Sequence, residues 1–298
     1  MKFNTETIKY YSDLFGLPEK AAEDCSRAFC SLDSDGELSR ILGAYLSGER
    51  EYNDTYPLVG ELARSKNVNE YTAYETMILL LCDSCRKAFR DAGLDDALFV
   101  ESLRDVAFKN RECLSVYGVN GVFAVKWYGN FFKVSRFKLG RLQFEIMPYK
   151  GPDTTVGGID VHDGDDVIKI HIPSSGEPFT GDACLDSYKK AFRFFGGKPG
   201  EKCVFHCISW LLYPEHRSFL KPGNIVRFLD DFKITNVKEY PTDPDLWRIF
   251  GTLSLDDISS LPEDTSLRKA YKERMLSGGM LGKGVGVFAF DGDNIITE

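Results

Sequence analysis

The first 117 residues carry apolar side chains at helical spacing, and glycines separate the periods. The strongest period runs from Thr72 to Ala92, contains the apolar run Met77 to Cys82, and stops at Gly93. The next period runs from Asp96 to Tyr117. Apolar residues three or four positions apart lie on one face of a helix, which buries that face against its neighbours. This part of the chain is therefore predicted to be a helical bundle.

Shorter helical periods precede these two. They cover Thr5 to Phe15, Pro18 to Cys30, Glu37 to Leu46 and Thr55 to Arg64. Glycine or proline lies at the ends of several of them, as is typical of helix boundaries. Val122 to Tyr128 is apolar throughout, and periodicity alone does not distinguish a short buried helix from a strand there.

Beyond Leu139 the apolar spacing changes to every second residue, which is typical of strands with one buried face. Strands are predicted at Arg136 to Met147, Val167 to Ile172, Cys203 to Leu212, Asn224 to Tyr240 and Gly282 to Phe290, with a helix from about Ser266 to Ser277. A further predicted helix, Ala183 to Phe195, lies between the second and third strands. Such a strand–helix–strand unit favours parallel neighbours. The fold class is thus α+β, with a helical domain over residues 1–138 and a mixed α/β domain over 139–298.

Composition limits the classes of partner. The chain has 298 residues, a formal net charge of -8 and no run of Lys or Arg, which makes nucleic acid an unfavourable partner. The segment Met1 to Glu6 lacks the apolar core of a signal peptide, and no stretch reaches the ~18 apolar residues of a membrane span. A cytoplasmic protein with a small-molecule substrate, bound to neither nucleic acid nor membrane, is expected.

The eight cysteines raise the question of disulfides or a metal site. Cys25 and Cys30 fall within one predicted helix, Cys82 and Cys85 fall within another, and no second close pair follows. No histidine precedes His162. A structural zinc site needs four ligands, usually arranged as two close pairs. Reduced and mostly buried thiols, with no metal, are therefore expected.

Two polar residues on the predicted strands are the strongest candidates for chemistry. Alternation places Glu145 on the face opposite Phe144, and it places His171 on the face opposite Ile170. Polar groups in a buried sheet need a partner or a function. A carboxylate or an imidazole on a strand can remove the proton of a reacting amine. The alternative is that Glu145 and His171 only satisfy one another inside a folded core.

Two other features favour packing over chemistry. Alternation places His206 and Trp210 on one face of the third strand and Cys207 on the other, so a Cys–His nucleophile and base are not favoured. The run from Gly278 to Gly286 has the order helix, loop, strand, whereas a phosphate-binding loop has the order strand, loop, helix. This run is interpreted as a close-packed turn that leads into a strand.

Four segments in this order form a recognisable pattern. They are Gly140-Arg-Leu-Gln-Phe-Glu145, His171-Ile-Pro173, Ser209-Trp-Leu-Leu212 and Asn224-Ile-Val-Arg-Phe228. Together they resemble a bacterial family of acyltransferase-domain proteins, which join a helical N-acyltransferase-type N-terminal domain to a GNAT-like C-terminal domain. The resemblance covers nearly the whole chain, and its motifs are concentrated in the stretch from the first segment to the last.

The resemblance implies a mixed sheet whose strands part around acyl-CoA, and transfer of an acyl group from acetyl-CoA or another acyl-CoA to a small amine. Glu145 and His171 would be catalytic. Arg141 and Trp210 are the candidate substrate-binding residues, with a structural ion pair as the alternative for Arg141 and a core position as the alternative for Trp210. The loop before the helix at Ala183 would hold the pyrophosphate through backbone N–H groups. Its cofactor-binding residues would be Ser174, Ser175, Gly176, Gly181 and Asp182.

A second hypothesis rests on what the loop lacks. The signature Gln/Arg-x-x-Gly-x-Gly/Ala of the wider superfamily is absent, and Pro173 and Pro178 supply no N–H donor. These departures favour a non-catalytic ligand-binding or interaction module on a GNAT-like fold with a degenerate cofactor loop. No Gly-x-Ser-x-Gly elbow of a hydrolase occurs.

Overall fold

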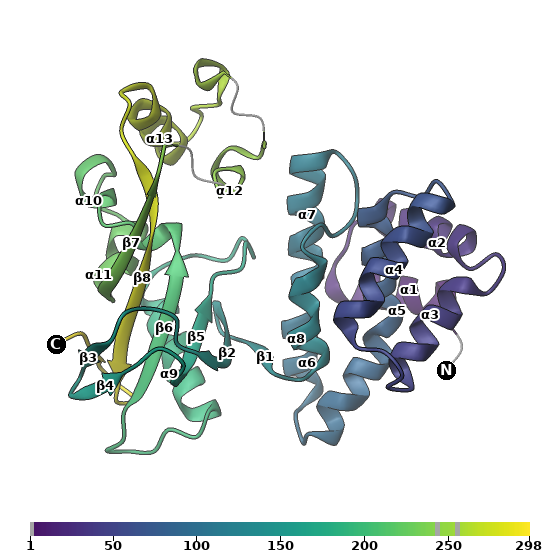
Figure 1. Cartoon of the computed structure of the whole chain (residues 1–298), viewed down its shortest axis with the longest axis horizontal. Helices are drawn as coiled ribbons and strands as arrows, with labels where there is room; N and C mark the ends of the chain where they lie inside the picture. The colour runs from purple at the N-terminus through teal and green to yellow at the C-terminus, as the bar shows by residue number, and fades with distance from the viewer. Residues whose placement is uncertain (1–2, 242–244, 254–256) are drawn as a thin grey trace. The chain divides into compact units, whose positions relative to one another are not determined.

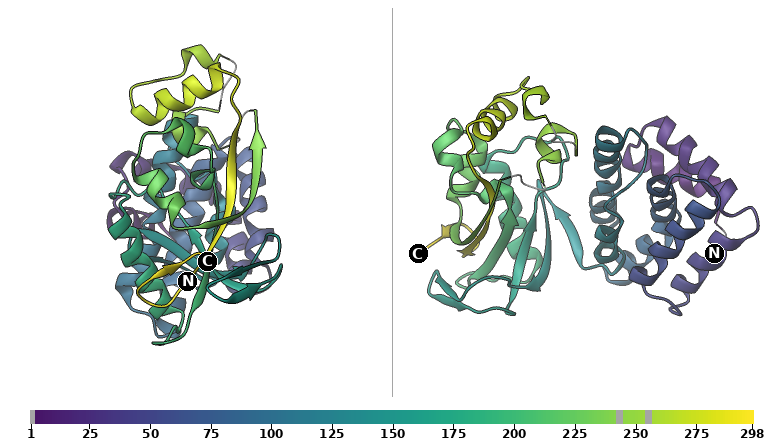
Figure 2. Two further views of the ribbon diagram at one scale, coloured as in Figure 1. Left: turned by 90° about the vertical axis from the view of Figure 1, so that its left-hand side faces the viewer. Right: turned by 45° about the horizontal axis from the view of Figure 1, so that its top comes forward.

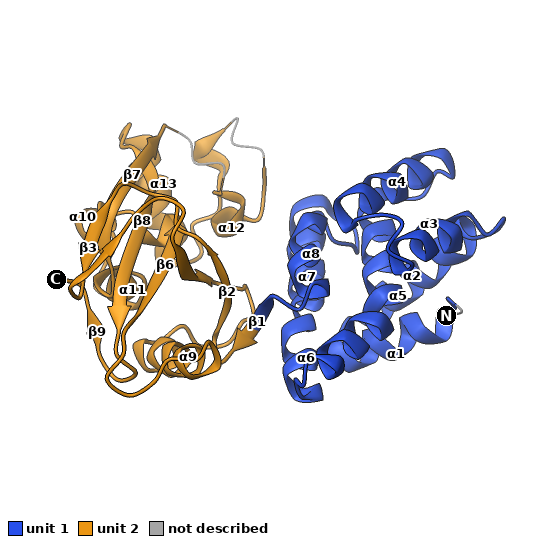
Figure 3. Ribbon diagram, turned by 60° about the horizontal axis from the view of Figure 1, so that its bottom comes forward, with its two compact units in different colours: residues 1–137 blue, residues 138–298 orange. Residues whose placement is uncertain are grey.

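The chain forms two compact units, Met1–Phe137 and Lys138–Glu298 (Figure 3). A computed structural model describes residues 3–241, 245–253 and 257–298. Each unit has its own core, and the two are described in turn.

The first unit is helical throughout, as the apolar spacing predicts. Its elements are α1 (Thr5–Phe15), α2 (Glu19–Leu32), α3 (Glu37–Leu46), α4 (Tyr52–Ser65), α5 (Glu70–Asp91), α6 (Asp96–Leu103), α7 (Asp105–Tyr117), the 3₁₀ turn η1 (Val125–Tyr128) and α8 (Gly129–Phe132). Helix α5 is the central one, because it contacts α1, α2 and α4 and is buried on all sides from Thr72 to Cys82. The ambiguous stretch Val122 to Tyr128 contains no strand, and its last four residues, Val125–Tyr128, form the 3₁₀ turn.

The predicted helix from Asp96 to Tyr117 is two helices in the structure. The chain breaks at Arg104, where the Ala107 N–H donates to the Arg104 carbonyl three residues back instead of four. This 3₁₀-type bond tightens the turn between α6 and α7. Helix α7 stands beside the other helices of its unit in Figure 1.

The second unit is a mixed sheet with helices. Its strands are β1 (Arg136–Leu139), β2 (Leu142–Pro148), β3 (Thr154–Val156), β4 (Ile159–Val161), β5 (Asp166–His171), β6 (Cys203–Ser209), β7 (Lys233–Tyr240), β8 (Leu281–Phe290) and β9 (Ile295–Ile296). Its helices and 3₁₀ turns are α9 (Gly181–Phe194), η2 (Trp210–Leu212), α10 (His216–Phe219), α11 (Asn224–Asp230), α12 (Trp247–Phe250), η3 (Ile258–Ser260) and α13 (Ser266–Leu276). The main sheet has the order β1-β2-β5-β6-β8-β7, β9 pairs with β8, and β3 and β4 form a separate hairpin. The predicted parallel pair is confirmed, since β5 and β6 are parallel and joined through α9.

Aromatic residues fill the sheet face that α9 covers. Tyr188 of α9 packs on Phe205, Phe288 and Phe290, with ring centroids 4.9 to 6.2 Å apart. Phe205 also meets Phe144 of β2 at 6.0 Å. The opposite face carries a smaller cluster under the β3–β4 hairpin. Large rings on one face therefore fix the position of α9 on the sheet.

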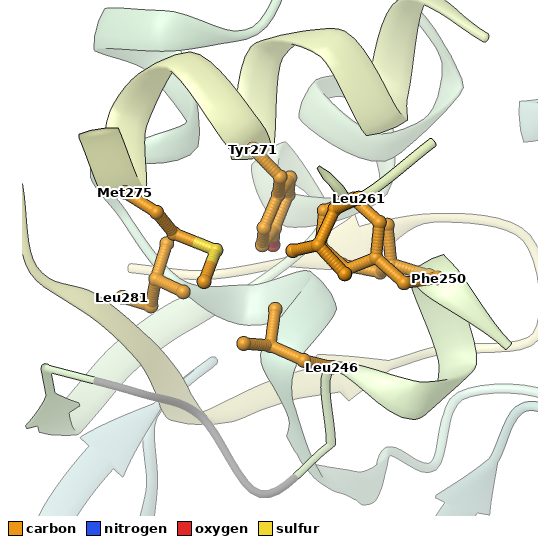
Figure 4. Packing of buried hydrophobic residues seen from close by; sticks show 7 residues of the cluster. Leu246, Phe250, Leu261, Tyr271, Met275 and Leu281 are labelled. Atoms are coloured by element: carbon orange, nitrogen blue, oxygen red, sulfur yellow. The ribbon is translucent and has the colours of Figure 1, made fainter. Parts of the chain in front are cut away.

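A third cluster lies around α12 and α13, beside the start of β8 (Figure 4). It consists of Leu246, Ile249, Phe250, Leu261, Tyr271, Met275 and Leu281, with Trp210 packed against it. Figure 2 shows α13 above the start of β8, where this cluster anchors the long β7–β8 pair.

Three strand predictions were wrong in detail. The stretch from Asn224 is helix α11 and then β7, because Phe228 packs on Phe232 and Phe232 on Phe288, an arrangement that overrides the β propensity of its branched residues. The strand from Cys203 stops at Ser209, whose Oγ accepts a hydrogen bond from the Leu211 N–H and begins η2. Arg136 to Met147 is two strands, β1 and β2. The hairpin β3–β4 was not predicted.

Candidate functional site

Glu145 and His171 meet on neighbouring antiparallel strands. The register pairs Glu145 with Lys169 and Gln143 with His171, so Glu145 and His171 are diagonal neighbours on one face of the sheet. Their side chains are joined by a hydrogen bond of 2.6 Å between Glu145 Oε1 and His171 Nε2. The Glu145 side chain is 1% exposed and that of His171 is 17% exposed. The two candidate residues are therefore in direct contact, with His171 on the outer side of the pair, and their catalytic role stays a prediction.

The strands β5 and β6 run parallel only briefly. Their register contains two Cα pairs, Ile168 with Phe205 and Lys169 with His206, although β5 continues to His171. The ladder thus ends before the strands do. His171 lies beyond its last rung, at the place where the two strands part.

Helix α9 begins near this point and has a capped N-terminus. Thr180 is the N-cap, and its Oγ1 accepts a hydrogen bond of 3.3 Å from the Ala183 N–H. In the part of the chain that the structure describes, the N–H groups of Gly181 and Asp182 have no acceptor. Unpaired N–H groups and the helix dipole favour an anion at a helix N-terminus.

A cation that was not predicted lies at the same N-terminus. A Cβ on Gly181 would come within 2.4 Å of the Arg227 guanidinium carbon, so the guanidinium packs directly over this glycine. Arg227 is exposed. It belongs to the segment Asn224 to Phe228, in which the resemblance was seen, but only the structure shows that α11 brings it to α9.

Arg141 holds the loop that precedes α9. Its Nε donates to the Glu177 carbonyl at 3.1 Å and an Nη donates to the Pro173 carbonyl at 2.9 Å. Its guanidinium also lies over the Phe179 ring. Burial lowers the pKa of Arg141, while the Glu177 carboxylate acts against that shift. The structure thus gives Arg141 a loop-holding position; the predicted substrate contact stays a prediction.

The turn between β1 and β2, which contains Gly140 and Arg141, is hydrogen-bonded to α9. Gly140 has a φ of 75°, and a Cβ there would lie 2.7 Å from Ser187 Oγ. The same hydroxyl accepts a hydrogen bond of 2.8 Å from the Arg141 N–H. Only glycine combines this backbone conformation with so close an approach.

The predicted cofactor residues occupy two positions in the loop. Ser174, Ser175 and Gly176 begin three residues after the end of β5, and Gly181 and Asp182 are the first two residues of α9. Ser175 Oγ accepts a hydrogen bond of 3.3 Å from the Glu177 N–H, and Glu177 pairs with Lys138 at 3.1 Å. The loop is thus shaped by its own polar contacts.

Lys169 and His206 are polar neighbours that the sequence did not single out as a site. They are cross-strand partners at the last rung between β5 and β6. Burial, reinforced by the Lys169 charge, lowers the pKa of His206 to about 3, so the ring is neutral at pH 7. Its Nδ1 lies 3.2 Å from the Gly286 carbonyl, which requires the Nδ1–H tautomer. Burial also lowers the pKa of Lys169, against the charges of Cys207 and Glu145.

Trp210 lies elsewhere. It begins the turn η2 and does not continue β6, so the prediction that it shares a strand face with His206 is wrong. Its ring meets His216 at 6.0 Å and Tyr271 at 5.9 Å, against the cluster of Figure 4. These contacts are packing contacts, and the predicted role of Trp210 in substrate binding stays a prediction.

The eight cysteines are free thiols, and six of them are buried, as expected. Burial raises the pKa of Cys207 to about 12, which makes it a poor nucleophile. The described residues contain no group of three or more His, Cys, Asp or Glu that could hold a metal ion. No described helix combines the length and the apolar character needed to cross a bilayer.

Comparison with known proteins identifies the family. Residues 6–134 match the N-acyltransferase N-terminal domain, and residues 136–288 match the GNAT-like C-terminal domain. The chain belongs to this two-domain acyltransferase family. No curated protein matches its sequence.

Solved structures share the fold of this family member. An acyltransferase in complex with decanoyl-CoA and teicoplanin is 20% identical, with a TM-score of 0.72 over 94% of this chain and 86% of that one. A mutant acyltransferase in complex with octanoyl-CoA is 19% identical, with a TM-score of 0.73 over 96% of this chain and 88% of that one. At such identities the likeness concerns the fold.

Proposed function

We propose that this chain is an acyl-CoA-dependent N-acyltransferase. The observation that carries the proposal is the hydrogen bond between Glu145 and His171, placed where β5 and β6 part. A structural pair inside a core would be buried on both sides, whereas the His171 side is partly exposed. The proteins with the same fold were solved with decanoyl-CoA, octanoyl-CoA and teicoplanin. These ligands make medium-chain acyl-CoAs the first donors to test, and they extend the acceptor class from small amines to larger molecules.

The two residues have different roles in this proposal. His171 Nε2–H donates to the Glu145 carboxylate, which leaves the lone pair on Nδ1. His171 is the base that takes the proton of the attacking amine, and Glu145 orients the ring and stabilises the imidazolium. The amine nitrogen forms a bond to the thioester carbonyl carbon, the C–S bond breaks, and CoA leaves as the thiol.

The N-terminus of α9 is suited to bind the pyrophosphate of the acyl-CoA donor. The N–H groups of Gly181 and Asp182 and the Arg227 guanidinium supply hydrogen bonds and positive charge for a pyrophosphate. The loop has fewer backbone N–H donors because Pro173 and Pro178 have none, and the N–H groups of the Arg227 guanidinium offset part of that loss. This local cation also explains how an acidic chain, with a net charge of -8, would accept a polyanion.

The test combines binding with turnover. Calorimetry with acetyl-, octanoyl- and decanoyl-CoA measures binding, and release of CoA thiol in the presence of a panel of amines and a glycopeptide measures transfer. We expect His171→Asn and Glu145→Gln to lower amine-dependent release by ~10²–10⁴ fold, with little change in the dissociation constant of the acyl-CoA.

The control for these variants is Glu201→Gln, which removes an exposed carboxylate of the same unit and should leave release unchanged. The proposal would be overturned if none of the three acyl-CoAs bound at about 1 mM, that is, if each binding free energy were weaker than about -4 kcal/mol. Full activity of His171→Asn would overturn the assigned base.

A further inference from the structure

Lys169 lies on the same sheet face as the Glu145–His171 pair and is not bonded to it. Its Cα is opposite Glu145 on β2 and opposite His206 on β6. Directly opposed residues of opposite charge ordinarily pair across antiparallel strands. Here Glu145 Oε1 is instead bonded to His171, the diagonal neighbour.

The ammonium group of Lys169 is partly buried and unbonded. Across residues 3–241, 245–253 and 257–298, no hydrogen bond or ion pair of its Nζ is found. The Nζ atom keeps contact with solvent, which leaves this hydrogen-bond donor open to a ligand. A donor held in this way is suited to a ligand oxygen, because little reorganisation is needed when the ligand binds.

The neighbouring imidazole does not supply that partner. His206 is fully buried, and its Nε2 makes no hydrogen bond with any described residue. Its ring is fixed by the Gly286 carbonyl and by an edge-to-face contact with Tyr149 at 4.9 Å. His206 is thus a fixed and uncharged neighbour of Lys169. Because its ring is neutral, no second positive charge lies beside the ammonium group.

We propose that Lys169 is a catalytic residue whose ammonium group donates a hydrogen bond to the carbonyl oxygen of the acyl thioester. The inference rests on the proposed function and deepens it. Lys169 is on the last rung before β5 and β6 part, two residues from His171 and on the same face. Strand β5 then supplies both the hydrogen-bond donor to the oxyanion and the base that accepts the proton of the amine.

The step balances with the residues present. As the amine nitrogen bonds to the carbonyl carbon, the π electron pair moves to the oxygen, and Lys169 stabilises the resulting oxyanion. The proton of the amine passes to His171. When the oxyanion collapses, the C–S bond breaks, and the thiolate takes a proton from the imidazolium or from water.

The test uses the chemical reactivity of the native protein. Full-length wild type is trace-labelled with acetic anhydride with no ligand, with CoA, and with decanoyl-CoA far above its calorimetric dissociation constant, and each lysine is quantified by peptide mass spectrometry. We expect decanoyl-CoA to lower labelling of Lys169 at least about fivefold, since the ligand occupies nearly all molecules, and to lower it more than CoA does. The exposed Lys87 and Lys269 are internal controls and should not change.

A kinetic measurement distinguishes the loss of the Lys169 hydrogen bond from a general disturbance of the fold. Lys169→Met should lower kcat by roughly 10²-fold, as removal of an oxyanion donor does, with the dissociation constant of decanoyl-CoA little changed, and Lys169→Arg should recover part of kcat. Unchanged labelling of Lys169 while calorimetry shows decanoyl-CoA bound would overturn the inference and leave the proposed function standing. Absence of acyl-CoA binding in calorimetry would overturn both.

Discussion

At the scale of single residues, two buried carboxyl groups have different hydrogen-bond partners. Glu145 is hydrogen-bonded to an imidazole at 2.6 Å. Glu75, in the middle of α5, is fully buried and receives hydrogen bonds only from Asn110 at 2.9 Å and Cys25 at 3.5 Å among the described residues. Burial raises the pKa of Glu75 from 4.5 to about 8, against the effect of these two hydrogen bonds. Glu75 is therefore expected to be mostly protonated at neutral pH.

The raised pKa of Glu75 predicts how stability depends on pH. The unfolded chain loses this proton near pH 4.5 and the folded chain near pH 8. The stabilisation is therefore complete below pH 4.5 and is lost as the pH rises to about 8. In Glu75→Gln this loss, on the order of 2–4 kcal/mol, should be absent. Urea unfolding of the full chain between pH 4.5 and 9 measures it.

The matched control is Glu23→Gln, which neutralises an exposed carboxylate on α2. It should retain the pH dependence of the wild type. If Glu75→Gln showed the same decline in unfolding free energy between pH 4.5 and 8 as the wild type, the assignment of a protonated Glu75 would be incorrect.

At the scale of elements, the glycine-rich start of β8 is a packing device. The interpretation of the run from Gly278 to Gly286 as a close-packed turn and strand is confirmed. A Cβ on Gly284 would lie 2.1 Å from the Leu212 carbonyl oxygen, and one on Gly286 would lie 2.9 Å from a Leu212 methyl group. The turn η2 therefore lies directly against β8, and side chains there would force the two apart.

Gly284→Ala should destabilise the second unit by about 1–3 kcal/mol, because the clash is with backbone and neither element can move without disturbing the sheet. Thermal unfolding measures the change. Gly43→Ala is the comparison: a Cβ at this helical position meets nothing within 4 Å, so that substitution should stabilise slightly. Equal melting temperatures for Gly284→Ala and the wild type would show that η2 is not packed on β8 as described.

Strand alternation was enough to predict Glu145 and His171 as candidate residues, because a period of two assigns faces without knowledge of the partner strand. It did not single out Lys169, whose proposed role depends on the register of β5 with both neighbours. Arg227 was missed for a related reason. Its segment was predicted to be a strand, and only the packing of Phe228 and Phe232 makes it a helix that reaches α9. Tertiary contacts, which no local pattern contains, decided both cases.

At the scale of the whole molecule, the change of apolar period near Leu139 predicted both a helical part and a mixed sheet. Order along the chain also predicted the parallel β5–β6 pair. The hairpin β3–β4 was not predicted, since each strand has three residues and too few alternations to be recognised. Family membership adds the class of chemistry, and the site residues of this chain supply the specific mechanism that we propose.

The most direct test of the central claim is a crystal structure of the full chain with decanoyl-CoA. The proposed mechanism predicts pyrophosphate oxygens within hydrogen-bonding distance of the N–H groups of Gly181 and Asp182 and of the Arg227 guanidinium. It predicts the thioester between β5 and β6, with its carbonyl oxygen about 2.7–3.1 Å from Lys169 Nζ and its carbonyl carbon beside His171. Decanoyl-CoA bound at another surface, with β5 and β6 unoccupied, would contradict it.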